Sequence, residues 1–364
     1  MTGTGTGSDD RPVRRSHGTV AVVPAPESDL VVAVTGPTGT FGYGLLPLLQ
    51  ADARIAHVVG VARRPFDPAA HGWTKMAYRQ GDVRDSAGLE QAFRGADVVV
   101  HLAFWITGTA TRAATRAVNV EGSLNALRAA AAAGARRFVF ASSVAAYGFH
   151  ADNPVGMTEE WPVRPADHLF YAQEKAELEH LLADEADRHA DLGLYLLRPS
   201  IVVGPHTIGA KGVVPAPLAP LLGRIAAGVA RLPVRLPAPV PRFPVQLVHE
   251  DDVGRALLLC IVGAGPPGAY NVAGDGVLST TDVVRELGLT AVPVPGGLVR
   301  APARAITALA ALPLAPPALA WAEVLRRPAV MDTAKAKRVL GWRPRYSGLE
   351  ALRATLRGGR GREG

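Results

Sequence analysis

The sequence predicts an α/β fold built on a doubly wound, Rossmann-type parallel sheet. Three observations indicate this fold. Short β-branched runs alternate with alanine- and leucine-rich stretches from Leu30 onward, a glycine-rich turn follows the first run, and a hydrophobic content of 48% over 364 residues is enough to bury a large core. Strands that alternate with helices form βαβ units, and their right-handed crossovers cover both faces of the sheet.

The elements follow from this alternation in chain order. The β-branched runs predict strands, and the longer alanine- and leucine-rich stretches predict helices between them. The expected strands are residues 30–34, 56–61, 98–102, 137–141 and 268–272, and the expected helices are residues 42–53, 89–93 and 112–133. Residues 205–244 are crowded with proline, and a strand and a helix return within residues 245–262.

Charge and cysteine content exclude several classes of function. The net charge of +7 lies largely in arginine clusters near the two ends, with no aromatic residues between them, so nucleic-acid binding is not expected. Cys260 is the only cysteine, so an intrachain disulfide and a cysteine-based metal site are both ruled out, and no metal is expected. A reducing, cytoplasmic location is the simplest interpretation, because the N-terminal residues have no apolar core typical of a signal peptide.

One uncharged segment, residues 305–322, is long enough to suggest a membrane span. Pro313, Pro316 and Pro317 interrupt it, and proline inside a helix costs about 3 kcal/mol. We therefore expect no integral membrane segment, but a buried helix, loop and helix around a substrate pocket. A patch that touches a membrane surface remains the alternative.

The first chemical motif is the glycine turn Gly36-Pro37-Thr38-Gly39-Thr40-Phe41-Gly42. It lies between the first predicted strand and the first helix. Glycine allows a sharp turn and a close approach of pyrophosphate to the backbone, and the helix N-terminus offers N–H groups to the phosphates. The spacing and its context favour a dinucleotide-binding site.

Tyr171 and Lys175 are four residues apart, which places them on one face of a helix. A free tyrosine has a pKa of about 10, and a nearby ammonium lowers it. Tyr171 is therefore a candidate to exchange a proton with a substrate oxygen while a hydride moves at the adjacent carbon. An ordinary exposed helix face is the alternative interpretation of this spacing.

Two further motifs end predicted strands. Asp82, in Gly81-Asp82-Val83, suits a hydrogen bond to an adenine amino group, and capping of the next helix is an equal alternative. Ser142 and Ser143 follow the strand at 137–141, where α/β sheets bind ligands. A simple turn at the strand end is the alternative for these serines.

Taken in order, these motifs resemble the extended short-chain dehydrogenase/reductase family, also described as the NAD-dependent epimerase/dehydratase family. The resemblance covers roughly residues 30–350. It also rests on His101-Leu102-Ala103, Asn119-Val120-Glu121-Gly122, the Ser142 to Gly148 segment, Arg198-Pro199 and the Asp332 to Trp342 segment.

The resemblance implies specific roles. Ser143, Tyr171 and Lys175 would be catalytic, with Tyr171 as the acid/base and Lys175 binding the nicotinamide ribose. Asn119 would support the lysine. The remaining cofactor contacts would come from Gly36, Thr38, Gly39, Thr40, Phe41, Gly42, Asp82, Val83, Leu102, Ala103 and Pro199.

The second predicted strand ends without the carboxylate that the family uses to bind the ribose of NAD. It is followed by Arg63 instead, and a guanidinium suits a 2′-phosphate. We therefore favour NADP over NAD. The alternative is that Arg63 only stacks over the adenine.

Four residues that depart from the motifs of the family narrow the range of expected reactions. Val144 and Ala145 replace the Asp-Glu pair of 4,6-dehydratases, while Ile201 and Val245 replace the Asn and Arg typical of nucleotide-sugar enzymes. The resemblance then favours a reductase or dehydrogenase acting on a ketone or secondary alcohol of a small or hydrophobic substrate. A sugar or nucleotide-sugar epimerase is the first alternative, and a non-catalytic dinucleotide-binding regulatory protein is the second.

The resulting domain organisation is interleaved. We expect a flexible tail at 1–29, a dinucleotide-binding domain at 30–204 to which 245–275 returns, a substrate-binding part at 205–244 and 276–350, and a basic tail at 351–364. The family analogy makes a homodimer plausible.

Overall fold

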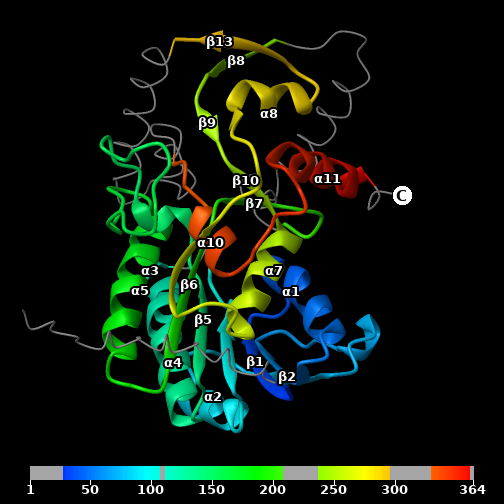
Figure 1. Ribbon diagram of the computed structural model, residues 1–364, viewed down its shortest axis with the longest axis vertical. Coiled ribbons are helices and arrows are strands. Elements are labelled where there is room, and N and C mark those ends of the chain that lie inside the picture. Colours follow the sequence, from blue (N-terminus) through cyan, green and yellow to red (C-terminus); the bar gives the residue numbers. More distant parts are fainter. Residues whose placement is uncertain (1–27, 107–110, 208–236, 296–328, 361–364) are drawn as a thin grey trace, which may run out of the picture.

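A computed structural model describes residues 28–106, 111–207, 237–295 and 329–360. Its main layer is a seven-stranded, fully parallel sheet in the order β11-β6-β5-β4-β1-β2-β3 (Figure 1). The strands are β1 (Leu30–Thr35), β2 (Ile55–Ala62), β3 (Met76–Gln80), β4 (Val98–His101), β5 (Arg137–Ala141), β6 (Gly193–Pro199) and β11 (Gly268–Val272). The predicted Rossmann-type sheet is confirmed.

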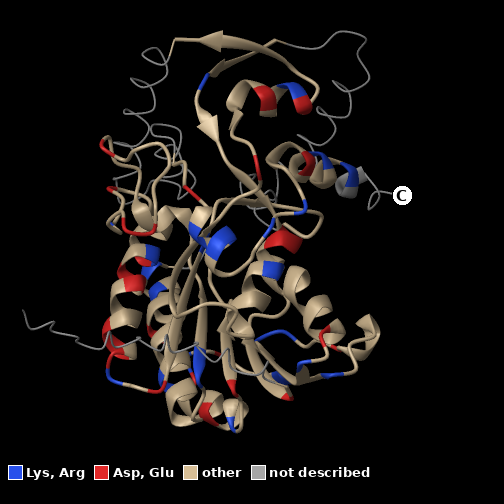
Figure 2. Cartoon of the chain, viewed as in Figure 1, with Lys and Arg blue, Asp and Glu red and all other residues tan. Residues whose placement is uncertain are grey.

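Helices cover both faces of this sheet, as the alternating strand pattern requires. Helices α1 (Thr40–Ala51) and α7 (Glu250–Ile261) share one core with Val32 and Val34 of β1. Helices α2 (Ser86–Phe93), α4 (Gly122–Ala132) and α5 (Phe170–Ala186) share the other core with Ala33. Consecutive strand residues therefore point into opposite cores. Figure 2 shows acidic and basic side chains mixed on the outer helices, while most of the sheet is uncharged.

The long helix expected over 112–133 is helical throughout but not uniform. It consists of α3 (Arg112–Arg116), a π-helical turn (Ala117–Glu121) and α4. The wider turn contains Asn119, which is fully buried and bonds to groups outside the helix. Turns of this kind occur mostly as single insertions within α-helices, and frequently at functional sites. The periodicity of alanine and leucine does not reveal such an insertion.

The chain reversal at β1 creates the ligand-binding end of the sheet. From β1 the chain moves outward to β2 and β3, then crosses to β4 on the other side of β1. Ligands bind at such switch points, outside the carboxyl ends of the strands. The glycine turn after β1 and the segment after β4 meet here, because a Cβ on Gly36 would lie 2.8 Å from the backbone nitrogen of Ala103.

Apart from α7 and β11, most of the described residues after β6 form a smaller part at one end of the sheet, seen at the top of Figure 1. Three short strand pairs build it: β7 (Ile201–Val203) with β10 (Leu247–His249), β9 (Pro244–Val245) with β12 (Leu278–Ser279), and β8 (Pro237–Pro241) with β13 (Thr290–Val294). Its helices are α8 (Thr280–Glu286) and α11 (Gly348–Arg360), while α10 (Ala334–Val339) packs against β11 of the main sheet. Short 3-10 turns occur at Ala69–His71 and Val144–Tyr147.

Within residues 245–275, α7 and β11 belong to the main layer, while β10 pairs with β7 in the smaller part. Residues 351–360 of the expected basic tail belong to α11. The expected N-terminal tail up to residue 27 and the segment 305–322 lie outside the described residues. Within the part of the chain that is described, no helix is long and apolar enough to cross a bilayer.

Two glycines set how closely α1 and α7 approach. A Cβ on Gly44 would lie 2.3 Å from the carbonyl oxygen of Glu250, and one on Gly254 would lie 2.1 Å from that of Gly44. The two backbones therefore touch, with no side chain between them. This contact fixes α7 against α1, the helix that begins at the glycine turn.

We predict that Gly254→Ala lowers the free energy of unfolding by about 1–3 kcal/mol, because the added methyl forces the two helices apart. Urea denaturation measures the change. Gly348→Ala is the matched control: its Cβ would meet no atom closer than 3.5 Å, so its effect should stay within about 0.5 kcal/mol. Equal losses in both variants would contradict the packing argument.

Candidate active site

The glycine turn has the backbone geometry of a phosphate-binding loop. Gly36 has a φ of 68°, in the left-handed region that favours glycine. A Cβ on Gly42 would lie 1.8 Å from the carbonyl oxygen of Pro37. Gly39 caps α1 without a side-chain hydrogen bond, and no acidic residue lies in the first turn. The start of α1, with Thr40, Phe41 and Gly42, therefore keeps the positive character that attracts an anion.

Asp82 lies beyond β3 and is paired with Arg84. Its carboxylate accepts hydrogen bonds from the Arg84 backbone N–H at 3.0 Å and from the guanidinium Nη2 at 2.7 Å. These hydrogen bonds lower the pKa of Asp82. The helix cap is Asp85, which accepts from the N–H of Gly88 at 3.0 Å. The alternative that Asp82 caps α2 is therefore wrong.

Arg63 lies just beyond β2, and its side chain is exposed. Its guanidinium carbon lies 4.3 Å above the ring centroid of Trp105. Trp105 follows β4, so the contact passes over the carboxyl end of β1, which separates β2 from β4 in the sheet. Arg63 also contributes to the lowered pKa of Asp82. Arg63 and Asp82 therefore lie at the same edge of the ligand-binding end.

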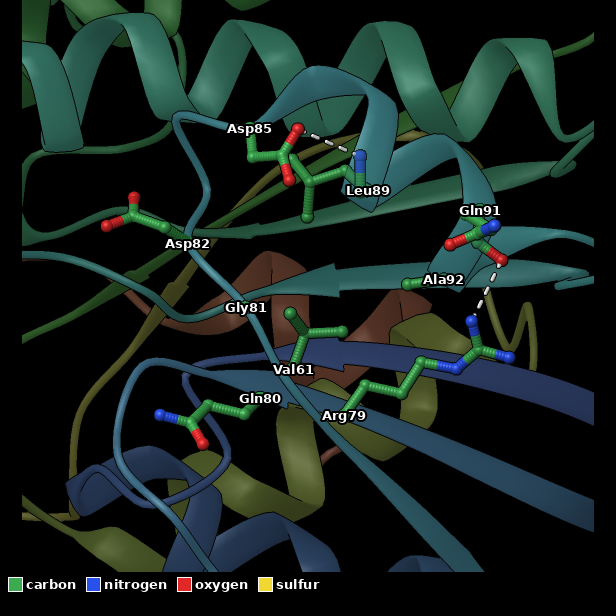
Figure 3. A pocket seen from close by; sticks show the side chains of 10 residues that line it. Val61, Arg79, Gln80, Gly81, Asp82, Asp85, Leu89, Gln91 and Ala92 are labelled. Atoms are coloured by element: carbon green, nitrogen blue, oxygen red, sulfur yellow. Dashed lines mark hydrogen bonds between the residues drawn. The ribbon is translucent and has the colours of Figure 1, made fainter.

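A pocket of about 220 Å³ lies between β3 and α2 (Figure 3). Asp82 and Asp85 lie at one end of it, and Arg79 donates to the carbonyl oxygen of Gln91 at the other. None of its lining residues belongs to the Ser143, Tyr171 and Lys175 group. It is therefore separate from those three side chains.

Ser143, Tyr171 and Lys175 come together as the sequence predicts. Tyr171 and Lys175 lie in α5, and Ser143 begins the 3-10 turn after β5. The side chain of Ser143 hydrogen-bonds with that of Tyr171, and the Lys175 ammonium lies 5.9 Å from the Tyr171 ring centroid. Burial raises the pKa of Tyr171, while the bond to Ser143 opposes that rise. This helix face is not an ordinary exposed one.

Lys175 is only 3% exposed, which is unusual for a lysine. Its Nζ donates to the carbonyl oxygen of Ala141 at 2.6 Å. Burial lowers the pKa of Lys175 to about 7, while the nearby Glu179 and Glu174 oppose that shift. The ammonium is therefore held at the edge of its charged state near neutral pH.

Asn119 connects the π-helical turn to the segment after β4. Its amide nitrogen donates to Glu174 at 2.7 Å and to the carbonyl oxygen of Trp105 at 2.9 Å. Its amide oxygen accepts from the N–H of Trp105 at 2.6 Å. The resemblance assigned Asn119 a supporting role, and these bonds place it between Trp105 and the neighbour of Lys175.

His101 is fully buried at the end of β4. Its Nδ1 lies 2.8 Å from Thr35 Oγ1 and its Nε2 lies 3.0 Å from Ser123 Oγ. Because Ser123 donates its proton to the carbonyl oxygen of Asn119, Nε2 carries the hydrogen and Nδ1 accepts from Thr35. Burial, with the charge of Lys175, lowers the pKa of His101 to about 3, so its role is that of a neutral hydrogen-bonding residue.

A buried polar network, consisting of Ser142, Glu179, Arg198 and Tyr147, lies next to the group of Ser143, Tyr171 and Lys175. Glu179 accepts from Arg198 Nη2 at 2.5 Å and from Ser142 Oγ at 2.5 Å. Arg198 also donates to Tyr147 at 2.7 Å. Sequence reasoning gave no role to Glu179, although its spacing of four residues from Lys175 places it on the same helix face. Ser142 thus serves this network, and Ser143 contacts Tyr171.

The other predicted contacts lie near the ligand-binding end, where Leu102 and Ala103 follow β4 and Pro199 ends β6. Val83 is buried against Gly122. Phe104 and Trp105, which sequence reasoning missed, directly follow the Ala103 motif, and that position was the available signal. No group of three or more potential metal-binding side chains occurs among the described residues.

Comparison with known proteins gives a family match. The model of the NAD dependent epimerase/dehydratase family matches residues 32–273. An uncharacterized protein of Mycobacterium tuberculosis is 27% identical over 338 residues, covering 92% of this chain and 85% of the relative. UDP-glucose 4-epimerase 4 of Oryza sativa subsp. japonica is 31% identical over 220 residues, covering 54% of this chain and 57% of that protein.

A solved structure has a similar fold over most of the chain. The UDP-glucose 4-epimerase of Thermus thermophilus, in complex with NAD, superposes with a TM-score of 0.64 at 26% identity, covering 91% of this chain and 99% of that one. The residues matched by the family model begin in β1 and end after β11. They therefore contain the glycine turn as well as Ser143, Tyr171 and Lys175.

We predict that Glu179→Ala lowers the free energy of unfolding by about 3–5 kcal/mol, because it leaves the buried Arg198 without its carboxylate partner. Thermal or urea unfolding measures the loss. Glu177→Ala is the matched control on the same helix, since Glu177 pairs with Arg116 at the surface and should contribute less than about 1 kcal/mol. Similar losses for the two variants would refute the distinction.

Proposed function

The chain belongs to the NAD dependent epimerase/dehydratase family, and from that premise we propose that it is a nicotinamide-dependent reductase or dehydrogenase. It transfers a hydride between the cofactor and a ketone or secondary alcohol of a small or hydrophobic substrate. The observation that carries the proposal is the pairing of Tyr171 with Ser143 beside the buried ammonium of Lys175. A protein that only binds a dinucleotide has no need of this arrangement.

The chemistry follows from these three side chains. When bound, the nicotinamide ring supplies or accepts the hydride. In ketone reduction the Tyr171 hydroxyl donates its proton to the substrate oxygen, and in alcohol oxidation the phenolate takes that proton back. Ser143 hydrogen-bonds with Tyr171 and is suited to hold the same substrate oxygen. The Lys175 ammonium stabilises the phenolate, because opposite charges favour each other strongly away from water.

The substrate class rests on four apolar residues. Val144 and Ala145 are buried where 4,6-dehydratases carry an acidic pair, so neither position can exchange a proton with substrate. Ile201 is 47% exposed at the start of β7. Val245 lies in β9, and neither side chain can bond a substrate pyrophosphate. These features favour an uncharged, apolar substrate over a nucleotide sugar.

A second candidate function is a sugar epimerase. It is favoured by the relatives, since the rice and Thermus thermophilus proteins are UDP-glucose 4-epimerases. Tyr171 and Ser143 serve this reaction equally well, because it oxidises and then reduces one carbon. The two functions differ in cofactor balance: a reductase consumes NAD(P)H, whereas an epimerase returns its cofactor unchanged.

The residues of the glycine turn fit a dinucleotide, because Gly36 and Gly42 leave no room for a Cβ and no side chain caps α1. Gly36, Gly39 and Gly42 would hold the pyrophosphate, Asp82 and Val83 the adenine, and Lys175 the nicotinamide ribose. Arg63 supports NADP over NAD, because β2 has no carboxylate at its end and a guanidinium can pair with a 2′-phosphate.

We predict that Tyr171→Phe lowers kcat by about 10²–10⁴-fold, because it removes the proton donor and leaves the ring in place. Turnover with a panel of ketones and NADPH gives the rate, and the cofactor-induced shift in melting temperature reports binding. Binding should be retained. Turnover that survives the substitution would overturn the assigned role, and an unchanged cellular function in the variant would favour the regulatory alternative.

We further predict that NADPH raises the melting temperature more than NADH at equal concentration. A ligand at about 100 times its dissociation constant adds roughly 2.7 kcal/mol, which corresponds to several degrees. Arg63→Gln should reduce the NADPH shift and leave the NADH shift unchanged. Arg64→Gln is the neighbouring control and should alter neither. A larger NADH shift in the unmodified protein would refute the preference for NADP.

A further inference from the structure

We propose that Phe104 is a positioning residue of the catalytic centre: one face of its ring holds the Lys175 ammonium, and its contact with Tyr171 fixes the phenol beside it. This inference rests on the proposed function for its catalytic meaning. The contacts that carry it belong to Phe104, Lys175, Tyr171 and Phe140 alone. Neither the family match nor the sequence motifs assign Phe104 a role.

Phe104 lies against both catalytic side chains. The Lys175 Nζ is 3.7 Å from the Phe104 ring centroid, closer than to Phe140 at 4.5 Å or Tyr171 at 5.9 Å. The Phe104 and Tyr171 rings meet edge to face, with centroids 5.6 Å apart and an interplanar angle of 90°. Edge-to-face contact is a favoured geometry for aromatic pairs, so Phe104 defines the orientation of Tyr171 as well as the position of the ammonium.

Hydrogen bonds to the next residue, Trp105, hold the backbone around Phe104 in place. Both the N–H and the carbonyl oxygen of Trp105 bond to the side chain of Asn119, at 2.6 and 2.9 Å. Asn119 in turn donates to Glu174, the residue before Lys175. The ring and the ammonium that it contacts are therefore tied to one another through a short chain of hydrogen bonds.

The aromatic faces take the place of a carboxylate partner. Glu179 and Glu174 are the carboxylates close enough to affect Lys175, but their oxygens accept hydrogen bonds from Arg198 and Asn119 respectively. The buried His101 is neutral, and Tyr171 is an un-ionised phenol at neutral pH. Besides the Ala141 carbonyl oxygen, which accepts from Nζ at 2.6 Å, the negative face of the Phe104 ring is therefore the aromatic surface nearest to a charge that burial disfavours.

An aliphatic side chain at position 104, which has no π electrons, would hold the ammonium less well. Since a cation–π contact favours the charged form, Phe104→Leu should lower the pKa of Lys175 by about one unit, while leaving an apolar side chain of similar size. The charge would then be lost at a lower pH. Phe104→Tyr keeps the aromatic face and should restore the original value.

The test measures Lys175 directly, without turnover. The chain has five lysines, so the full-length protein labelled with ¹³C at lysine Cε gives a short set of resonances, and Lys175→Arg identifies the one that belongs to Lys175. We expect its titration midpoint to fall by about one pH unit in Phe104→Leu and to be unchanged in Phe104→Tyr. Phe93→Leu, in the same core but on α2, is the control for a purely structural effect and should not move the midpoint.

A midpoint in Phe104→Leu that matches the unmodified protein, or an equal shift in Phe93→Leu, would overturn the proposal. Because the titration needs neither cofactor nor substrate, its outcome is separate from that of the proposed function. Where ketone reduction is observed, the alkaline limb of kcat/KM should move with the midpoint, because the reaction needs the charged lysine. A fall in kcat/KM with no movement of that limb would show that Phe104 only shapes the site.

Discussion

The buried ion pair between Glu179 and Arg198 is the interaction on which the rest of the site depends. It joins α5, which carries Tyr171 and Lys175, to β6, the strand between β5 and the edge strand β11. Ser142 bonds to the same carboxylate, so the end of β5 is fixed to the helix as well. A pair with both charges out of water holds only when every polar atom finds a partner, which makes its geometry strict.

That constraint extends beyond α5. Arg198 donates to Tyr147, and Tyr147 donates to Asn271 in β11 at 2.8 Å. Asn271 donates onward to the carbonyl oxygen of Met157, between β5 and α5, and to that of Asp332, just before α10. One polar network therefore connects α5, the returning strand β11 and the segment that leads into the C-terminal helices. The direct backbone contact between Gly44 and Gly254 fixes the opposite face of the sheet in a similar way.

The sequence predicted local secondary structure well, but it predicted the contacts between separate segments poorly. The strands at 137–141 and 268–272 were found with the bounds that the structure gives, because β-branched and aromatic runs between turns are a local signal. The spacing of Tyr171 and Lys175 also placed both side chains correctly in one helix. The partner of Arg198, the stacking of Arg63 on Trp105 and the capping of α2 by Asp85 depend on how separate segments pack. No spacing rule encodes these contacts, and the π-helical turn at Asn119 breaks the period on which helix prediction relies.

The same three side chains can serve a reductase and an epimerase, so the choice between them depends on what holds the substrate. An epimerase must keep its oxidised intermediate bound until the hydride returns to the same carbon. A charged pyrophosphate is a strong anchor for that purpose, because it offers charge-assisted hydrogen bonds. Ile201 and Val245 provide no such bonds at the corresponding places. A ketone held mainly by apolar contacts leaves after one hydride transfer, since nothing retains it through the second. The absence of polar anchors at these two positions is therefore the argument for the proposed net oxidation or reduction, since the proposed role of Tyr171 is common to both reactions.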